Sequence, residues 1–554
     1  MVAPTPTHLT HPALLADIER GLIKIPQFQR EFVWSLQSSA KLLDSVIKGY
    51  PVGTFIFWTT RERLRSVREI GGITLPDAPE GTEVAFVLDG QQRLTSLFAA
   101  IRGEKIVRPS GSIDDFSLIF IDLKATEHDS IVVTDVSDLE PGSWITLTDL
   151  LTGGTRVAKK YADEFLDNID SYRERLASYD FPIVKVADVE IDVATEIFTR
   201  INVGGKSLTT FEIMAAKTYD ETRDFDLSAK FDDLLGRLES VEYETVSDAI
   251  LLQLVSLILD GECNKKSILR LDKNEFIDCW PAATDALESA VEYFRGTYRI
   301  PASKLLPFNA LLVPFAYFFY HHRAKPNPNQ KKLLEDFFWR CALGGRYSAS
   351  TESRLAQDKH RIDRILTSES PDYDWAVDVN PEFLIQNGWF TPSRAFVKAI
   401  LCLFAYHEPK SFEDNAKVHI GNAWLKQANS RNYHHFFPRA YLKKKGRTER
   451  EANNVLNITI VDADLNKRLI RADAPSKYMK RFSESNPDIE KTMASHLIGS
   501  FKRFGFGSDD YDVFLRRRAE LVSAELSKRI IDRPVDQRGQ VARDDDLDEE
   551  PSDN

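Results

Sequence analysis

Cysteine is scarce in this 554-residue sequence, which contains only four, scattered along the chain. They form no C-x-x-C pair, so the sequence indicates neither a structural zinc site nor a disulfide framework. Long apolar runs are missing as well, because the most apolar stretch, residues 310–320, is too short to span a bilayer and contains Pro314. The sequence also opens without a signal-peptide pattern. We therefore expect a cytoplasmic protein with no membrane partner.

Net charge is negative overall, at −12, but the charge is unevenly distributed. Residues 421–534 carry 23 Lys and Arg against 14 Asp and Glu, whereas residues 535–554 carry 2 against 8. A basic region attracts phosphate and favours a nucleic-acid partner, although a basic helical surface can also be an ordinary solvated face. The acidic end is too charged and too poor in apolar residues to fold, so we expect it to be disordered.

The chain is too long for one hydrophobic core, and it contains no internal repeat, so we expect several domains. An α+β class is predicted, because residues 1–224 mix strand and helix patterns whereas residues 225–388 are helical throughout. Within the helical part, residues 250–259 are apolar nearly all round and should be buried. The predicted divisions are completed by a domain over residues 389–534 and the acidic tail over residues 535–554.

The first candidate site lies in EVAFVLDGQQRLTSLFAAIRG, residues 83–103. Residues 84–88 predict a buried strand, Asp89 and Gly90 a sharp turn, and the following residues a helix. A glycine turn that leads into a helix presents backbone N–H groups to an anion such as a nucleotide phosphate, and Arg93 adds a charged donor. In the alternative interpretation, Asp89 only caps the helix, and the glutamines and the arginine lie on its exposed face.

A second stretch, KIPQFQREFVWS, lies upstream at residues 24–35. Residue 25 precedes a proline and should be extended, and Ser35 can cap a helix over residues 36–49. A buried strand should follow within residues 49–58. Arg30 lies between the extended segment and this helix, where a basic side chain is well placed to meet an anion.

The third candidate site begins at YHHFFPRAYL, with the adjacent pair His434 and His435. Asn457 follows within residues 455–461, which predict a strand, and Asn466 comes nine residues after it. That gap leaves room for the strand to end and a helix to begin. Two groups that bind a divalent ion, with a histidine base beside one of them, are what phosphodiester hydrolysis requires. The alternative is a β-hairpin and a helix with two buried polar side chains.

This layout resembles the HNH (ββα-metal) endonuclease motif, in the variant found in the C-terminal domain of GmrSD-type restriction enzymes. The resemblance implies that His434 is the first metal ligand, a position more often occupied by aspartate, and that His435 is the general base. It also implies that Asn457 supports the loop through hydrogen bonds and that Asn466 is the second metal ligand. Histidine in place of aspartate widens the choice of metal from Mg²⁺ toward Mn²⁺ or Ni²⁺.

The N-terminal stretches, IPxFQRxFVW followed by DGQQRLTSL, are similar to the N-terminal domain of the same family. That domain has a ParB/sulfiredoxin-like fold and hydrolyses nucleoside triphosphates, and ParB proteins carry a comparable Gly-x-x-Arg helix start. The resemblance implies a nucleotide site, with GTP, UTP and ATP all open as ligands, and a hydrolytic role for Asp89 and Arg93. Its expected binding residues are Arg30, Gly90, Gln91, Gln92 and Arg93.

A further family feature is IFTRINVGGKSLTTFEI, residues 197–213. Arg200 should lie at the end of one helix. Ser207 or Thr209 can cap the next helix, with Glu212 as the capping-box partner of Thr209.

Taken together, the resemblance implies an anti-phage DNA endonuclease or nickase in which an NTP-hydrolysing domain regulates an HNH nuclease that uses Mg²⁺ or Mn²⁺. Its partner would be double-stranded DNA that carries modified cytosine or, in the SspE-like branch, phosphorothioate, and a homodimer is a further expectation. One alternative is an NTP-switched DNA-binding regulator with an inactive nuclease domain, and another is a nuclease whose N-terminal half is only a scaffold. Candidate phosphate contacts are Lys443, Lys444, Lys445, Arg447, Lys467, Arg468, Arg471, Lys480 and Arg481.

Overall fold

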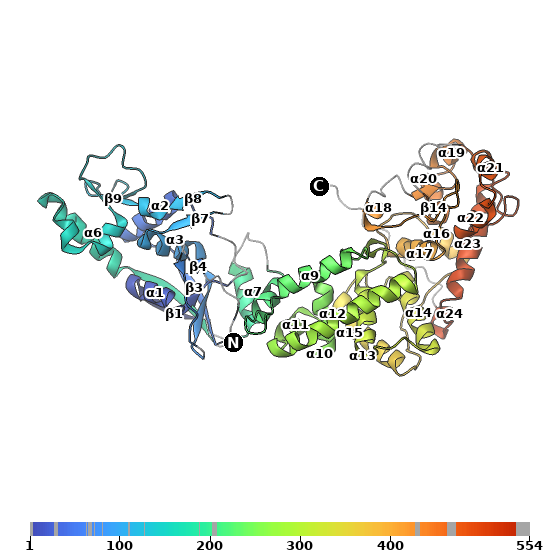
Figure 1. Cartoon of the computed structure of the whole chain (residues 1–554), viewed down its shortest axis with the longest axis horizontal. Helices are drawn as coiled ribbons and strands as arrows, with labels where there is room; N and C mark the ends of the chain where they lie inside the picture. Colours follow the sequence, from blue (N-terminus) through green and yellow to red (C-terminus); the bar gives the residue numbers. More distant parts are fainter. Residues whose placement is uncertain are drawn as a thin grey trace. The chain divides into compact units, whose positions relative to one another are not determined.

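The computed structural model describes residues 4–26, 32–61, 64, 69–70, 73–79, 81–108, 111–126, 128–187, 189–201, 208–426, 433–461 and 473–538. The chain divides into two compact units, an N-terminal unit (Met1–Leu227) and a C-terminal unit (Ser228–Asn554), coloured blue to green and green to red in Figure 1. The predicted α+β class is confirmed, and the finer division of the C-terminal unit stays a prediction. Within the described ranges, no helix has the length and apolar character needed to cross a membrane.

A mixed five-stranded sheet forms the centre of the N-terminal unit, with its strands in the order β1-β12-β3-β6-β2. Strand β12 runs parallel to β3, and β2 runs parallel to β6, whereas β1 pairs antiparallel with β12 and β3 antiparallel with β6. Their bounds are β1 Thr5–Thr10, β2 Ile23–Lys24, β3 Phe55–Thr60, β6 Val84–Asp89 and β12 Asp180–Ala187. The central strands are apolar and buried, as a strand inside a covered sheet requires.

The same core includes residues of α1 (His11–Glu19), α2 (Leu36–Ile47) and α3 (Gln91–Arg102). Ser35 caps α2 by accepting a hydrogen bond from the backbone N–H of Ser38 at 3.2 Å, which confirms the predicted cap. Helix α3 is buried nearly all round, so the predicted strand, turn and helix form one rigid part of the core. This places the first candidate site at the junction of the sheet with a core helix.

Residues 105–178 add small sheets and short helices beside the main sheet, in the region labelled β7, β8, β9 and α6 in Figure 1. Strand order β10-β9-β11 makes one sheet, and β7 and β8 form a hairpin. The bounds are β7 Lys105–Val107, β8 Ile113–Asp115, β9 Phe120–Asp122, β10 Val132–Val133, β11 Trp144–Thr146, α4 Leu147–Thr152, α5 Gly154–Ala158 and α6 Leu166–Ser178.

Helices α7 (Ile191–Ile201) and α8 (Thr210–Thr218) follow the sheet. The hydroxyl of Thr209 accepts from the backbone N–H of Glu212 at 3.1 Å, and the carboxylate of Glu212 accepts from the backbone N–H of Thr209 at 2.8 Å. The predicted capping box is therefore confirmed. Ser207, the alternative cap, lies outside the described residues.

The C-terminal unit begins with a helical part whose core helices are apolar on most faces. Helix α10 buries most of the predicted stretch 250–259, and it packs with α12 and α13. The bounds are α9 Leu227–Glu239, α10 Asp248–Leu259, α11 Lys265–Arg270, α12 Lys273–Gly296, α13 Leu312–His321, α14 Pro328–Leu343, α15 Thr351–Leu366, α16 Pro381–Gln386 and α17 Ala395–Tyr406.

The remainder of this unit surrounds a two-stranded hairpin formed by β13 (Tyr433–His435) and β14 (Ile458–Ile460). Short helices lie between the two strands, and longer helices follow the hairpin, with α23 running along one side of this part in Figure 1. The bounds are α18 Asn422–Lys426, α19 Arg439–Lys444, α20 Glu449–Ala452, η5 Val455–Asn457, α21 Pro475–Ser485, α22 Ile489–Ser495, α23 Tyr511–Ser527 and α24 Pro534–Arg538.

Two expectations about this part of the chain need correction. The strand expected over residues 455–461 is shorter, because residues 455–457 form the 3-10 helix η5, so Asn457 precedes the strand. The side chain of Asn454 accepts from the backbone N–H of Leu456 at 2.9 Å and stabilises this turn. The chain is also folded at the start of the predicted tail, because Asp536 of α24 forms an ion pair with the buried guanidinium of Arg340 at 2.5 Å.

Candidate functional site

Asn457 forms hydrogen bonds that link the segment after the histidine pair to the start of β14. It is fully buried, and its side-chain oxygen accepts from the backbone N–H of Phe437 at 2.8 Å. Its amide nitrogen donates to the carbonyl oxygens of Phe437 at 2.9 Å and Ala452 at 3.0 Å. The backbone N–H of Phe436 donates to the carbonyl of Asn457 at 2.7 Å. These bonds hold the two residues after His435 at fixed positions, as the predicted supporting role of Asn457 requires.

His435 is held by Asn453, a residue that the motif did not indicate. The Nε2 atom of His435 lies 2.9 Å from the side-chain oxygen of Asn453. The amide nitrogen of Asn453 donates to the carbonyl of Phe390 at 3.0 Å, and this fixes which end of the amide faces the histidine. Since an amide oxygen only accepts, Nε2 carries the proton of the neutral ring, and Nδ1 carries the lone pair. A general base needs such a lone pair.

Burial also keeps His435 neutral. Desolvation of the ring lowers the pKa of His435 from 6.5 to about 4, while the hydrogen bond with Asn453 acts in the opposite direction. The ring packs edge-on against Phe390, with the ring centres 6.3 Å apart. His435 is therefore unprotonated at neutral pH and can accept a proton.

His434 contacts a different set of residues. Successive side chains of a strand point to opposite faces, and His434 packs edge-on against the ring of Tyr478 in α21, 5.9 Å between centres. Only 2% of its surface is exposed. The predicted second ligand, Asn466, lies outside the described residues. The described residues thus supply one of the two predicted metal ligands and include no group of three His, Cys, Asp or Glu that could hold an ion.

Sequence reasoning missed Asn453, and only a weak signal could have found it. Asn453 and Asn454 form an amide pair just before the apolar residues of η5 and β14. Such pairs more often end a helix, and Asn453 does follow the last residue of α20. Its bond to Phe390 joins residues 63 positions apart, which no local pattern reports.

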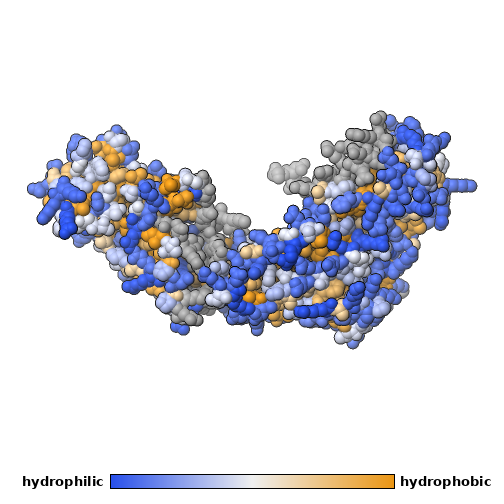
Figure 2. Space-filling view, in the orientation of Figure 1, coloured by the Kyte–Doolittle hydropathy of each residue, from blue (hydrophilic) through white to orange (hydrophobic). Residues whose placement is uncertain are grey.

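The basic residues around the hairpin fall into two groups. Lys443, Lys444 and Lys445 lie exposed on and just after α19, where the visible surface is mostly hydrophilic (Figure 2). Arg447 instead pairs with Asp512 and Glu451, and Arg481 pairs with Asp473 at 2.9 Å. The lysines therefore remain the better candidates for phosphate contacts. Lys467, Arg468 and Arg471 lie outside the described residues.

In the N-terminal unit, the predicted turn lies between β6 and α3 and depends on glycine. Gly90 has a φ of 96°, a left-handed conformation that disfavours other residues. A Cβ atom at this position would lie 2.4 Å from a ring carbon of Phe55, so no side chain fits without movement of the ring. Gly90 itself occupies the N-cap position of α3 and brings the backbone N–H groups of the first turn to the end of β6.

Arg93 and Asp89 are bonded to each other at this turn. The guanidinium of Arg93 donates to a carboxylate oxygen of Asp89 at 2.8 Å and to the carbonyls of Val52 at 2.8 Å and Thr54 at 3.0 Å. It also lies over the Phe55 ring, 5.0 Å from the centre. Asp89 therefore does not cap the helix, which corrects the alternative interpretation. Arg93 joins the turn to the segment before β3.

The two glutamines of the turn are buried, not exposed, with 8% of Gln91 and 7% of Gln92 accessible. The side-chain oxygen of Gln92 accepts from the backbone N–H of Val33 at 2.8 Å. The segment that follows position 30 is thus attached to the start of α3. Arg30 itself lies outside the described residues.

The basic and aromatic pair Arg346 and Tyr347, after α14, has a structural role. Arg346 donates to the buried carboxylate of Asp358 at 3.1 Å, and the hydroxyl of Tyr347 donates to the same group at 2.7 Å. Arg346 also lies over the ring of Trp375 at 4.4 Å. These contacts hold the segment after α14 against α15.

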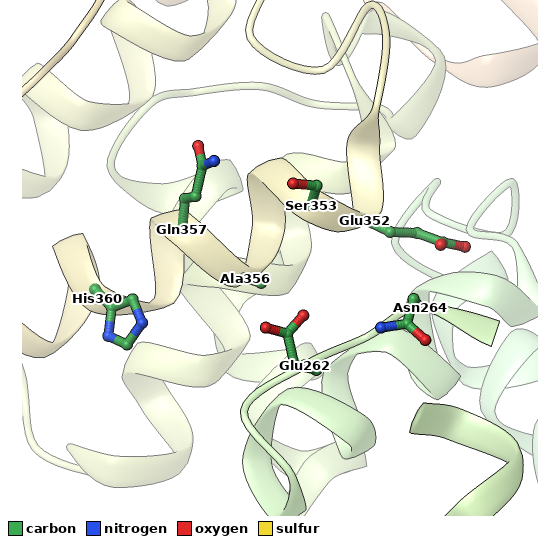
Figure 3. A pocket seen from close by; sticks show the side chains of 7 residues that line it. All are labelled: Glu262, Asn264, Glu352, Ser353, Ala356, Gln357 and His360. Atoms are coloured by element: carbon green, nitrogen blue, oxygen red, sulfur yellow. The ribbon is translucent and has the colours of Figure 1, made fainter. Parts of the chain in front are cut away.

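A pocket in the helical part opens between α15 and the segment before α11, as Figure 3 shows. It contains none of the residues predicted from the sequence. Two of its lining side chains are carboxylates, which disfavour an anion such as a nucleotide. Its lining residues are Glu262, Asn264, Glu352, Ser353, Ala356, Gln357 and His360.

Two comparisons relate the chain to known proteins. Residues 13–219 match a family model described as the GmrSD restriction endonuclease N-terminal domain. Over nearly its whole length the chain is also similar to the uncharacterized protein MJ0686 of Methanocaldococcus jannaschii, with 22% identity over 582 residues that cover 95% of this chain and 96% of that protein. The N-terminal part of the resemblance is thereby supported, and it points to a restriction endonuclease.

Proposed function

We propose that this chain is a metal-dependent DNA endonuclease or nickase of the HNH type, that it acts in phage defence, and that His435 is its general base. The observation that carries the proposal is the bond between His435 Nε2 and Asn453 at 2.9 Å, which leaves the lone pair on Nδ1. The match of residues 13–219 to the N-terminal domain of a restriction endonuclease supports the endonuclease activity and the role in phage defence.

In this proposal, DNA lies against the hairpin and the exposed lysines of α19 contact its phosphates. The Nδ1 atom of His435 takes a proton from the water that attacks the phosphodiester bond. Asn457 keeps the backbone of Phe436 and Phe437 in place, so the imidazole stays aligned during the attack. A Mg²⁺ or Mn²⁺ ion, held by His434 and Asn466, would neutralise the phosphate and stabilise the leaving oxygen.

The N-terminal unit is proposed to bind and hydrolyse a nucleoside triphosphate at the turn between β6 and α3. Helix starts favour phosphate, and Arg93 lies in the first turn of α3 beside Asp89. Binding would regulate the nuclease through movement between the units, since the two sites lie in different units of the chain. The proposed DNA partner carries modified cytosine or phosphorothioate, and the proposed assembly is a homodimer.

Plasmid nicking by the purified full chain tests this proposal. Cleavage is measured in Mg²⁺, in Mn²⁺ and in EDTA, each with and without GTP, UTP or ATP, on unmodified, cytosine-modified and phosphorothioate DNA. We expect metal-dependent nicking that His435→Ala slows by about 100-fold or more. His360→Ala is the matched control, because the side chain of His360 is exposed on α15. This variant should cleave DNA at the wild-type rate. Full activity of the His435 variant would overturn the proposal.

A further inference from the structure

Arg518 is a buried arginine in α23 whose hydrogen-bond partners are backbone carbonyls. None of its surface is exposed, and no carboxylate among the described residues pairs with it. Burial lowers its pKa to about 9. Burying a charge without a partner of opposite sign is costly, so a position that keeps one calls for an explanation.

Backbone carbonyls at the start of β14 explain why a buried arginine is present, because they need a hydrogen-bond donor. Alternate carbonyls of a strand point to opposite edges, and the carbonyl of Asn457 faces β13, where it accepts from Phe436. Ile458 begins β14, so its carbonyl faces the other edge, where the two-stranded sheet has no third strand among the described residues, and the carbonyl of Leu456 belongs to the 3-10 helix η5 just before it. One guanidinium nitrogen of Arg518 donates to both carbonyls, at 2.8 Å and 2.6 Å.

Two further contacts fix the guanidinium itself. Its other terminal nitrogen donates to the carbonyl of His496, just after α22, at 2.9 Å. The ring of Phe404 in α17 lies beneath it, 4.5 Å from the guanidinium carbon to the ring centre. Arg518 thus connects α17, α22 and α23 with the residues on either side of Asn457.

We propose that Arg518 is a positioning residue of the nuclease site, an inference that rests on the proposed nuclease function. By holding the carbonyls of residues 456 and 458, it fixes the backbone from which the Asn457 side chain reaches Phe437. Ile458 is also the residue that faces His435 in the hairpin. The guanidinium thereby links the start of β14 to α17, to the end of α22 and to α23.

A second buried arginine of the same unit serves as the matched control. Arg340 in α14 is also fully buried, but it pairs with the carboxylates of Asp336 at 2.9 Å and Asp536 at 2.5 Å. It joins α14 to the segment around α24, and none of these hydrogen-bond partners belongs to the hairpin. Loss of this arginine should lower stability without altering the geometry around His435.

The experiment compares Arg518→Lys with Arg340→Lys in the full chain. Single-turnover cleavage of a plasmid, binding of uncleaved duplex in EDTA and the thermal midpoint are measured for each. We expect Arg518→Lys to cleave about 10-fold to 100-fold more slowly while its DNA affinity stays within about two-fold of wild type. Arg340→Lys should melt earlier and cleave at the wild-type rate below its melting range.

A double variant distinguishes positioning from general stability. If Arg518 acts through His435, the variant that combines His435→Ala with Arg518→Lys should cleave no more slowly than His435→Ala alone. Equal cleavage by Arg518→Lys and wild type, or an additive loss in the double variant, would overturn the inference.

A second substitution, Arg518→Gln, is made in case Arg518→Lys does not fold. Glutamine keeps an N–H donor without the charge. If neither variant folds, Arg518 supports the whole unit and not the site, and the inference is wrong. If wild type cleaves no DNA under any condition, the proposed function fails instead, so the two failures are distinguishable.

Discussion

The two candidate sites are built in different ways. At the N-terminal turn, one hydrogen bond lies within the sequence motif, from Arg93 to Asp89, while Arg93 also donates to the carbonyls of Val52 and Thr54. At the C-terminal hairpin, the motif residues are held from outside the motif, by Asn453 for His435 and by Arg518 for the backbone around Asn457. The first motif therefore supplies one of its own supporting bonds, whereas the groups that hold His435 and the backbone around Asn457 lie outside the second motif.

The largest expected effect is a reciprocal separation of the two activities. His435→Ala should lose about 100-fold or more in DNA cleavage while it releases phosphate from NTP at the wild-type rate. Arg93→Ala should lose NTP hydrolysis, because its guanidinium connects the turn to the segment before β3.

Phosphate release and nicking, measured side by side on both variants, check this separation. If both variants lose both activities, the sites are not separate. If wild type releases no phosphate from any nucleotide, the N-terminal unit is a scaffold or a reader of DNA.

Gly90→Ala should lower the free energy of local unfolding around α3 by about 2–3 kcal/mol. The alanine would be strained in the left-handed conformation, and its Cβ would also clash with the ring of Phe55. Gly446→Ala in the C-terminal unit is the matched control, because Gly446 has a φ of 82° with no atom within 4 Å of an added Cβ. Gly446→Ala should lower the free energy of local unfolding by about 1 kcal/mol, from the left-handed strain alone. Hydrogen exchange of peptides from α3 and α19 measures both, and equal losses would contradict the role of the Phe55 contact.

Asn453→Ala should slow cleavage by about 10-fold, because His435 loses the acceptor that fixes its tautomer. Asn329→Ala removes an exposed asparagine of α14 that also bonds a backbone carbonyl, and it serves as the control. Single-turnover cleavage at saturating enzyme makes the comparison. An Asn453 variant as fast as its control would show that His435 is oriented without it.

Each unit should also show a pH dependence of stability. Burial lowers the pKa of His11 in the N-terminal unit and of His496 in the C-terminal unit from 6.5 to about 4. Between these values the unfolded chain binds more protons than the folded one, so each unit loses stability as the pH falls from 6.5 to 4.

Each histidine contributes up to about 1.4 kcal/mol per pH unit in this window. Hydrogen exchange at pH 7, 6 and 5, corrected for the intrinsic rates, should show that His11→Gln flattens this dependence in β12 peptides. His496→Gln should flatten it in α22 peptides instead. A variant that left the slope of its own unit unchanged would contradict the assignment.

Much of the fold could be predicted because its signals are local. The strand before Gly90, the helix after it, the Ser35 cap and the Thr209 capping box all depend on residues within four positions of one another. Asn457 was expected on a strand because Val455 and its neighbours favour strands. It lies instead in η5, because side-chain bonds across the fold outweigh that preference.

The supports of the candidate nuclease site could not be predicted in the same way. Arg518 is 62 residues from Leu456, and Phe390 is 63 residues from Asn453, so only the folded chain brings these groups together. In sequence, Arg518 is one of three consecutive arginines in a helix, which is also the pattern of a solvated face.

The most direct test of the account is the tautomer of His435 in the folded chain, measured by ¹⁵N NMR on histidine-labelled protein. The His435 signals are identified by their loss in His435→Ala. At pH 7 we predict a neutral ring with its proton on Nε2 and an unprotonated Nδ1, and a change in this pattern in Asn453→Ala. A ring protonated on Nδ1 would contradict the claim that the structure holds His435 ready to act as the base.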